Sequence, residues 1–404
     1  MPSTVVELRG HIIDSYILPR VWAAIMDAGA RYHVLAMRVG QSETETSEAR
    51  LEVIADTQAA LDDLVLELEQ LGATLAEEAD ARTERVAQPG VLPDAFYATT
   101  NLPTEVRVAG RWVTVADIEM DVAIVVDRAA GIARTSPMHE VAVGDEVVVG
   151  HAGIRVTPLQ RPREREVFGF MQNPISSERA KARAIHDVAG EMRAARVRGG
   201  RILFVLGPAV VHTAARESIT RLIRRGYIQV IFGGNAIVAH DVEAAMFGTS
   251  LGIDLKTGEP VEHGHRNHLR AINTVRAAGS LEAARERGLL GDGIVAAALD
   301  HGVTLVLAGS IRDDGPMPGV ITDSIEAQGA MRRAVQGGVE VAVMVASMLH
   351  GIATGNLLPA ATRAVVVDIS PAVVTKLADR GTAQAVDLVT DAELFLSALA
   401  AELS

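Results

Sequence analysis

The stretch Thr304-Leu-Val-Leu-Ala-Gly-Ser-Ile-Arg-Asp-Asp-Gly-Pro316 decides which fold class this sequence predicts. A short apolar run leads into a turn of small residues, and a cation, two adjacent carboxylates, a glycine and a proline follow. A buried strand can end in this way, with its carboxyl end opening into a polar site, and open α/β sheets bind ligands at that edge. Because the pattern recurs through the C-terminal half, the sequence predicts a nucleotide-dependent enzyme.

The C-terminal half alternates apolar runs with helical or loop segments from about residue 185 onward. Near-continuous apolar runs are typical of parallel strands that are covered on both faces. Crossover segments between such strands indicate a doubly wound parallel sheet. The predicted strands are Ile202–Leu206, Ile228–Phe232, Val303–Leu307, Val339–Val345, Ala364–Val367 and Val386–Val389. We therefore predict an α/β domain over residues 185–404.

The first 87 residues predict a small ferredoxin-like α+β domain with the order β-α-β-β-α. Apolar residues at helical spacing begin at Leu18, and Thr57 can cap a second helix. The strand-like segments are Val5–Ile13, Tyr32–Val39 and Arg50–Ala55. Residues 76–87 are charged and lack an apolar face, so we expect a hinge there. A domain of this kind commonly pairs subunits or senses a small molecule.

Residues 88–160 predict a small β domain or half-barrel. Gly, Asp and Pro turns separate short strand-like runs, which are Val106–Val108, Trp112–Val115, Val122–Val126, Gly131–Arg134 and Val147–Val149. A connector of Pro, Arg and polar residues over 161–184 leads to the C-terminal domain.

Composition excludes several classes of function. The chain has 404 residues and a formal net charge of −13, which argues against bulk affinity for nucleic acid. It contains no Cys, so disulfides, thiolate metal sites and Cys nucleophiles are excluded. We find neither a signal-peptide pattern at the N-terminus nor a run of about 18 uncharged apolar residues. These features predict a cytoplasmic protein without a membrane span.

The predicted strands of the C-terminal half end in small or acidic residues. The segments that directly follow predicted strands include Gly233-Gly-Asn-Ala236, Ala346–Gly351, Asp368-Ile-Ser370 and Thr390-Asp391. Small residues let backbone N–H groups approach a ligand, and helix N-termini favour phosphate. An acid that ends a strand can bind a pair of ribose hydroxyls, and Asp368 is our candidate. Several such ends along one sheet edge favour dinucleotide binding, although the Gly-x-Gly-x-x-Gly fingerprint and a phosphate-loop Lys are absent from the sequence.

Three polar motifs leave alternatives open. The histidines of Glu262–His268 lack a convincing spacing for metal ligands, so no metal is predicted. That stretch is either a substrate-facing polar loop or a surface or subunit-contact loop. Arg312, Asp313 and Asp314 form either a salt-bridged turn or a recognition site in which one acid binds the cofactor or an amine and the Arg binds a carboxylate. His350 is either a packed core residue or a cofactor contact.

Several motifs, taken in order, resemble those of a known family. They are Gly207-Pro-Ala209 with Val211-His-Thr213, Gly233-Gly-Asn-Ala236, Gly264-His265 with His268-Leu269, Ala308–Pro316, Met348-Leu-His350 with Gly355-Asn-Leu-Leu-Pro359, Asp368–Leu377 and Leu388-Val-Thr-Asp391. In this combination the chain resembles the archaeal-type ornithine cyclodeaminase family. That family is often labelled as sharing the conserved region of lysine-oxoglutarate reductase/saccharopine dehydrogenase, and the resemblance covers nearly the whole chain.

The resemblance implies a nucleotide domain similar to that of deoxyhypusine synthase, bound NAD, and conversion of L-ornithine to L-proline and ammonia. The implied route removes a hydride, closes the ring and returns the hydride. It needs a base for the δ-amine, a cation for the carboxylate and a site closed to water. Some relatives carry an arginine dihydrolase domain in front. This chain has neither room for one nor a Cys nucleophile, so we expect that arginine is not a substrate.

The resemblance also assigns residues, by motif position and strand ends. Asp313, His265 and His268 are the candidate bases, and Arg312 is the candidate partner of the substrate carboxylate. The cofactor candidates are Asn235, Ala236, Asp314, Ser347, Met348, Leu349, His350, Asp368, Ile369 and Asp391. The alternatives are an amino-acid or opine-type NAD-dependent dehydrogenase and a non-enzymatic NAD or amino-acid sensor. We further expect a homo-oligomer that binds an amino acid, and neither nucleic acid nor membrane.

Overall fold

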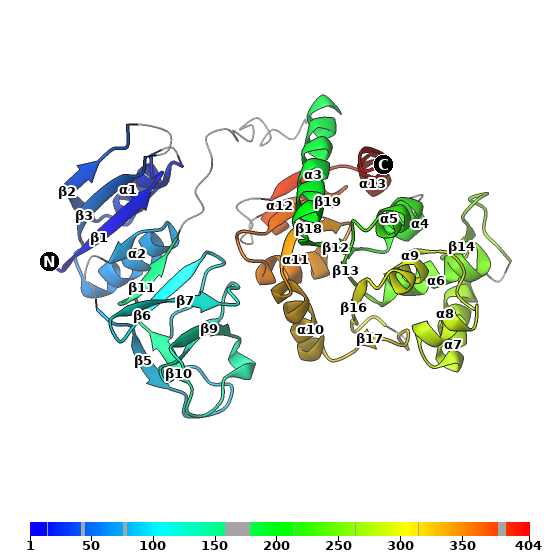
Figure 1. Ribbon diagram of the computed structural model, residues 1–404, viewed down its shortest axis with the longest axis horizontal. Helices are drawn as coiled ribbons and strands as arrows, with labels where there is room; N and C mark the ends of the chain where they lie inside the picture. Colours follow the sequence, from blue (N-terminus) through cyan, green and yellow to red (C-terminus); the bar gives the residue numbers. More distant parts are fainter. Residues whose placement is uncertain are drawn as a thin grey trace. The chain divides into compact units, whose positions relative to one another are not determined.

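The chain divides into two compact units, residues 1–172 with 359–361 and residues 173–358 with 362–404. This computed structural model describes residues 1–13, 15–41, 45–75, 79–157, 178–213, 215–262, 264–313, 315–378 and 385–404. The first unit contains two sheets, and the second contains a parallel sheet with helices around it (Figure 1).

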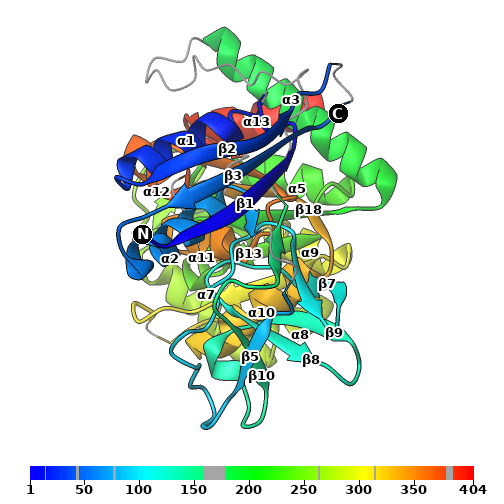
Figure 2. The same cartoon turned by 90° about the vertical axis from the view of Figure 1, so that its left-hand side faces the viewer.

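The N-terminal part of the first unit has the predicted ferredoxin-like order. Its sheet runs β2-β3-β1-β4 with antiparallel pairs, and Figure 2 shows β1, β2 and β3 side by side. Thr57 caps α2 as predicted, because its hydroxyl accepts a hydrogen bond from the Ala60 N–H at 3.2 Å. The elements are β1 (Ser3–Gly10), α1 (Ile17–Asp27), β2 (Arg31–Arg38), β3 (Ser47–Ile54), α2 (Gln58–Gln70) and β4 (Thr74–Leu75).

A second antiparallel-rich sheet follows, with the order β11-β6-β7-β9-β8-β10-β5. Its strands are β5 (Arg82–Arg85), β6 (Thr104–Val108), β7 (Arg111–Ala116), β8 (Ala123–Asp127), β9 (Ile132–Ser136), β10 (Glu146–Val149) and β11 (Ile154–Val156), and the 3₁₀ helix η1 (Met138–Glu140) precedes β10. The small β domain that the sequence predicts is therefore present, and every strand-like run predicted in it overlaps a strand, although the runs from Val122 and Gly131 each begin one residue before it.

The predicted hinge over residues 76–87 is wrong where the structure describes it. Residues 82–85 form strand β5, which pairs antiparallel with β10 along the edge of the second sheet. This strand carries no apolar residue, since an edge strand can be held by backbone pairing and by polar contacts such as Thr83 with Glu146 at 3.2 Å. Residues 76–78 lie outside the described ranges.

A buried ion pair connects α2 with the turn after β10 inside the first unit. Nδ1 of His151 lies 3.0 Å from Oε2 of Glu69, whose side chain is 3% exposed. The hydrogen bond that Nδ1 of His151 donates to Glu69 raises the pKa of His151 against the opposing effect of burial. Burial raises the pKa of Glu69, and the contact with His151 opposes that shift. The pair therefore favours the protonated imidazole in the folded state.

The second unit is built on a seven-stranded parallel sheet with the order β17-β16-β13-β12-β18-β19-β20. The strands are β12 (Arg201–Leu206), β13 (Val230–Gly233), β16 (Thr304–Ala308), β17 (Val320–Ile321), β18 (Val339–Val345), β19 (Arg363–Asp368) and β20 (Val386–Val389). The chain moves outward from β12 in one direction through β13 and β16, and in the other through β18 and β19. The predicted doubly wound sheet is confirmed, and its order reverses between β12 and β18.

Helices cover both faces of this sheet, since five of the six residues of β12 are buried. Three of the helices pack against one face through Met331, Leu357 and Leu377. The helices and short strands are α3 (Glu178–Arg198), α4 (Ala209–His212), α5 (Ala215–Arg224), α6 (Asn235–Phe247), β14 (Thr249–Ser250), β15 (Ile253–Asp254), η3 (Gly264–Arg266), α7 (Asn267–Ala278), α8 (Leu281–Glu286), α9 (Ile294–Asp300), α10 (Ser324–Gln336), α11 (Met348–Leu357), α12 (Pro371–Ala378) and α13 (Ala392–Glu402).

The predicted connector over residues 161–184 overlaps α3, whose helix begins at residue 178. Residues 161–177 lie outside the described ranges, so the boundaries of the connector stay a prediction. Among the helices of the described residues, none combines the length and the apolar character that a bilayer crossing requires.

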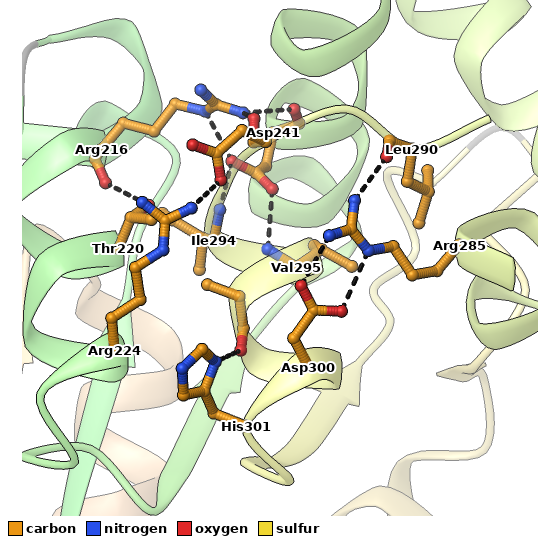
Figure 3. A network of polar contacts seen from close by, with 12 residues as sticks. Arg216, Thr220, Arg224, Asp241, Arg285, Leu290, Ile294, Val295, Asp300 and His301 are labelled. Atoms are coloured by element: carbon orange, nitrogen blue, oxygen red, sulfur yellow. Dashed lines mark hydrogen bonds and ion pairs between the residues drawn. The ribbon is translucent and has the colours of Figure 1, made fainter. Parts of the chain in front are cut away.

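Asp241 fixes helix α6 to its neighbours (Figure 3). Its carboxylate is 2.7 Å from Nε of Arg216 on α5 and accepts the N–H groups of Ile294 and Val295 at 3.0 and 2.8 Å. It thereby pairs with a cation and caps the first turn of α9. A Cβ at Gly293 would lie 2.1 Å from Arg216 Nη2, so glycine leaves the space that this contact needs. These contacts of Asp241 connect α6 to α5 and α9.

We expect His151→Gln to destabilise the protein more at pH 6 than at pH 8. Because the pKa of His151 is raised, the stability that its protonated ring supplies is present below the ordinary value of about 6.5 and is lost as the pH rises through the raised value. We expect a loss of about 1.5–3 kcal/mol at pH 6, the range for a hydrogen bond to a charged group. Urea unfolding at both pH values measures it. His139→Gln, which alters a surface histidine of the same unit, is the control, and an equal loss at both pH values would contradict the prediction.

Candidate functional site

The carboxyl ends of β12 and β18 meet at the point where the strand order reverses. A Cβ at Gly207, just after β12, would lie 1.7 Å from the carbonyl oxygen of Ala346, just after β18. The Gly207 N–H donates to the Val345 carbonyl at 2.9 Å. Ala346 adopts a φ of 51°, a left-handed conformation that costs a non-glycine residue about 1–2 kcal/mol. Strain of this kind is concentrated at ligand sites, and ligands of open α/β sheets bind at this reversal.

Two helices begin at this edge without a capping side chain. The N-caps of α6 and α11 are Gly234 and Ser347, and neither side chain forms a capping hydrogen bond. By contrast, Asp323 caps α10 and Asp391 caps α13, each with a carboxylate. The first N–H groups of α6 and α11 are therefore available to an anionic group, and the helix dipoles favour a phosphate there.

His350 connects the ends of three strands. From the first turn of α11 its Nε2 lies 3.1 Å from the Ala308 carbonyl oxygen at the end of β16. Its ring also approaches the turn after β13, since a Cβ on Gly234 would lie 3.0 Å from His350 Cε1. The structure thus brings this predicted residue to the sheet edge, where it packs beside Gly234.

Large apolar side chains are exposed along the same edge. Met348 and Leu349 on α11 are 46% and 66% exposed, and Ile369 after β19 is 73% exposed. Each Å² of apolar surface that is removed from water contributes roughly 25 cal/mol of stabilisation, and these exposed side chains forgo that contribution. A ligand with a flat apolar face, such as a nucleotide base, would cover them.

The polar candidates along this edge have local partners. Asp368 accepts the Ser370 N–H at 2.8 Å through Oδ1. The Oδ1 of Asn235 accepts the Met317 N–H at 2.9 Å. Asp391 accepts the N–H groups at the start of α13, so its carboxylate serves as a helix cap. Ala236 follows Asn235 in the first turn of α6.

The predicted recognition loop after β16 is folded on itself. Oδ2 of Asp313 accepts the Ser310 N–H at 2.7 Å, and the Arg312 N–H donates to Ser310 Oγ at 3.3 Å. The side chain of Arg312 is exposed. Asp314 lies outside the described residues. These hydrogen bonds show that the segment is a turn, and its role in ligand recognition stays a prediction.

Three histidines lie together, one from each of the helices α4, α6 and α7. The ring centroids of His212 and His240 are 5.0 Å apart, and those of His240 and His268 are 6.0 Å apart. His212 ends α4, which follows β12, and His240 lies in the second turn of α6, which follows β13. His268 was predicted from the sequence, and its Nδ1 is buried without a hydrogen-bond partner among the described residues. The side chain of His265 lies outside the described residues.

Glu243 anchors this histidine cluster, which we define as His212, His240 and His268. Its side chain is fully buried, and its Oε2 lies 2.9 Å from Nδ1 of His240. Its Oε1 accepts the Thr249 hydroxyl at 2.9 Å and the Gly252 N–H at 3.2 Å. Burial raises the pKa of Glu243, but these hydrogen bonds outweigh burial and the net pKa is lowered. The carboxylate is therefore ionised at neutral pH.

Sequence reasoning missed His240 and Glu243. Their spacing of three residues puts them on one face of a helix, and that helix follows the Gly233-Gly234 turn. That helix has so little amphipathic character that a polar pair inside it did not stand out.

Three family models together match nearly the whole chain. One is described as arginine dihydrolase ArgZ-like, C-terminal, Rossmann fold, and matches residues 186–399. A second is described as the first region of the same C-terminal part and matches residues 103–185. The third is the LOR/SDH bifunctional enzyme conserved region, over residues 3–102.

Relatives with an assigned activity align over the whole of this chain. The chain is 48% identical to an ornithine cyclodeaminase of Methanothermobacter thermautotrophicus, covering 100% of this chain and 98% of that protein. It is similar to the crystal structure of ArgZ, a cyanobacterial arginine dihydrolase, with 38% identity and a TM-score of 0.86 over 100% of this chain and 58% of that one. A ternary complex of AgrE with ornithine and NAD⁺ is 40% identical, with a TM-score of 0.54 over 100% of this chain and 57% of that one.

Gly207→Ala is expected to lower the free energy of unfolding by about 1–3 kcal/mol or more, because the added Cβ overlaps the Ala346 carbonyl oxygen. Gly190→Ala on α3 is the control: nothing lies within 4 Å of its added Cβ, and helix propensity favours Ala by up to about 1 kcal/mol. Urea denaturation of both variants measures the difference. Equal stability of the two variants would show that the approach at the strand reversal is not tight.

Proposed function

The chain belongs to the family whose C-terminal model is described as arginine dihydrolase ArgZ-like with a Rossmann fold, and on that premise we propose that it converts L-ornithine to L-proline and ammonia. It is an enzyme whose cofactor is NAD. The structural observation that carries the proposal is the strand reversal, where Gly207 meets Ala346 and α6 and α11 begin without capping side chains.

Bound NAD supplies a two-electron oxidant that accepts hydride from the substrate and gives it back, so the overall conversion is redox-neutral. The protein's own residues must therefore hold the cofactor through the whole cycle. The N–H groups that begin α6 and α11 suit its pyrophosphate. The exposed apolar edge at Met348 and Ile369 suits a base, and we propose that Asp368 binds ribose hydroxyls.

The substrate's own charges define the rest of the site. Ornithine carries a carboxylate and two ammonium groups at neutral pH, and an amine must lose its proton before it can attack carbon. We propose that the exposed guanidinium of Arg312 binds the carboxylate, as guanidinium groups commonly do. His268, His265 and Asp313 are the proton acceptors that the sequence proposes, and of these the structure brings His268 into the histidine cluster.

The remaining cofactor assignments are proposals of two kinds. The first kind is supported by position, at or beside the two helix N-termini or the exposed apolar edge. These proposed cofactor contacts are Asn235, Ala236, Ser347, Met348, Leu349, His350 and Ile369. Asp391 is already used as a helix cap, so we propose that it acts by holding α13. Asp314 stays a proposal from sequence, as do a homo-oligomeric state and a cytoplasmic location.

Purified protein is expected to carry NAD and to convert ornithine to equimolar proline and ammonia without net NADH. Mass analysis of released cofactor, amino-acid analysis and absorbance at 340 nm measure these quantities. Accumulation of NADH in proportion to ornithine would instead identify a dehydrogenase. Protein that holds NAD but leaves ornithine unchanged would refute the proposed activity.

Asp368→Ala is expected to lower the NAD content of the purified protein at least about tenfold, because a charge-assisted hydrogen bond contributes about 1.5–3 kcal/mol. Asp127→Ala is a matched control, since Asp127 likewise accepts N–H groups of the turn that follows it, but in the first unit. Cofactor content per protein chain is the measurement. Unchanged NAD content in Asp368→Ala would remove that residue from the binding site.

A further inference from the structure

We propose that His240, oriented by Glu243, exchanges protons with the substrate amine. This inference deepens the proposed function and rests on it. His240 would take up a proton from a substrate ammonium group through Nε2, while the Glu243 carboxylate holds the opposite ring nitrogen. Glu243 is a positioning residue in this account, because it acts through the imidazole.

The hydrogen bonds around Glu243 determine how the ring is oriented. One carboxylate oxygen lies 2.9 Å from Nδ1 of His240, and the other accepts the hydroxyl of Thr249 and the N–H of Gly252. Asn267 on α7 in turn donates to the Thr249 hydroxyl oxygen at 3.0 Å. An ionised carboxylate accepts hydrogen bonds, so Nδ1 carries the proton and Nε2 is left as the basic nitrogen.

The location of the pair fits a role in catalysis. His240 lies five residues beyond Asn235, which is about 7–8 Å along the helix from the strand end. His212, which reaches His240 from α4, follows the end of β12 through the Gly207 turn. The ring of His240 is therefore near the carboxyl edge of the sheet, on α6, which begins with the free N–H groups.

The burial of the Glu243 carboxylate is unfavourable by itself. An ionised carboxyl out of water costs several kcal/mol unless its hydrogen bonds compensate for the lost hydration. Asp241 on the same helix is also buried, but its carboxylate pairs with a guanidinium and accepts backbone N–H groups, whereas Glu243 directs one oxygen at an imidazole nitrogen. A carboxylate that orients an imidazole is the arrangement that proton-transfer sites use.

The other titratable groups facing His240 are compatible with this role. They come from α4, α6 and α7, and are His212, Glu243 and His268. Burial and the neighbouring His240 lower the pKa of His212, so this ring is neutral at neutral pH. Nδ1 of His212 lies 2.7 Å from the Ser250 hydroxyl oxygen. Glu243 is the group of this set that is hydrogen-bonded to the ring of His240.

The proton balance closes over one turnover. Ornithine enters with a net charge of +1, and the products are zwitterionic proline and ammonium, whose charges also sum to +1. Hydride removal also releases one proton from the α-ammonium and leaves a protonated imine, and the ring nitrogen of proline recovers that proton when the hydride returns. The δ-amine gives its proton to His240, attacks the imine carbon and displaces the α-nitrogen as ammonia. The imidazolium then returns the proton to that ammonia, so the histidine ends the cycle in its starting state.

The test compares the full-length protein with His240→Asn and Glu243→Gln, using proline formation from ornithine across pH 6–10. At neutral pH we expect His240→Asn to lower kcat by about 100-fold or more, the contribution typical of a positioned base. The deficit should shrink toward pH 10, because an alkyl ammonium with a pKa of about 10.4 begins to lose its proton without help. We expect Glu243→Gln to lower kcat more than it changes KM, because the amide no longer fixes which ring nitrogen of His240 carries the proton.

His301→Gln is the matched control, because His301 closes α9 with Nδ1 3.0 Å from a backbone carbonyl oxygen. It should keep kcat within about twofold. Melting temperature and bound NAD are measured for every variant, and His240→Asn carries the test if Glu243→Gln does not fold. If the unmodified protein forms proline while folded His240→Asn stays within threefold of it, or shows a loss that is constant across pH, this inference is overturned and the proposed function stands. If the unmodified protein forms no proline, both are overturned.

Discussion

The contact between Gly207 and Ala346 is the constraint on which the rest of the C-terminal unit depends. From β12 the chain continues toward one end of the sheet, and from β18 it continues toward the other end. The loops that follow these two strands must therefore diverge, yet their backbones touch at Gly207 and Ala346. A side chain on the first residue is sterically excluded, and the second residue is held in a left-handed conformation. Helix α4 begins two residues after Gly207 and α11 two residues after Ala346, so both helices start close to the strand ends. The first turn of α11 and the polar side chains of α4 and α6 consequently lie along one edge.

Much of the fold could be predicted from the sequence because burial on both faces leaves a strong pattern. Val339–Val345 and Val386–Val389 were predicted with their observed ends, because each is a short run rich in valine. Strand β5 could not be predicted, because an edge strand with polar side chains on both faces carries no hydrophobic signal. The cap at Thr57 was visible because its chemistry is local.

The candidate site was predictable where it follows strand ends, and much less so where it depends on tertiary contacts. Ser347 and His350 come directly after a predicted strand, so the sheet edge was sufficient to find them. Glu243 lies nine residues beyond Gly234, and its partners come from α6 itself and from the segment after it. Nothing in the local pattern shows that its carboxylate is buried. The same holds for Asp391, whose role as a helix cap competes with the cofactor role inferred from its position.

The central claim is that the carboxyl edge around the strand reversal is one pocket for NAD. Hydrogen–deuterium exchange of the protein with and without added NAD, after removal of bound cofactor, tests it most directly. The account predicts slower exchange at residues 207–212, 234–238 and 346–351, and unchanged exchange at residues 226–229 and 301–303 at the amino ends of β13 and β16. Protection confined to other parts of the chain, or none at the three loops, would contradict it.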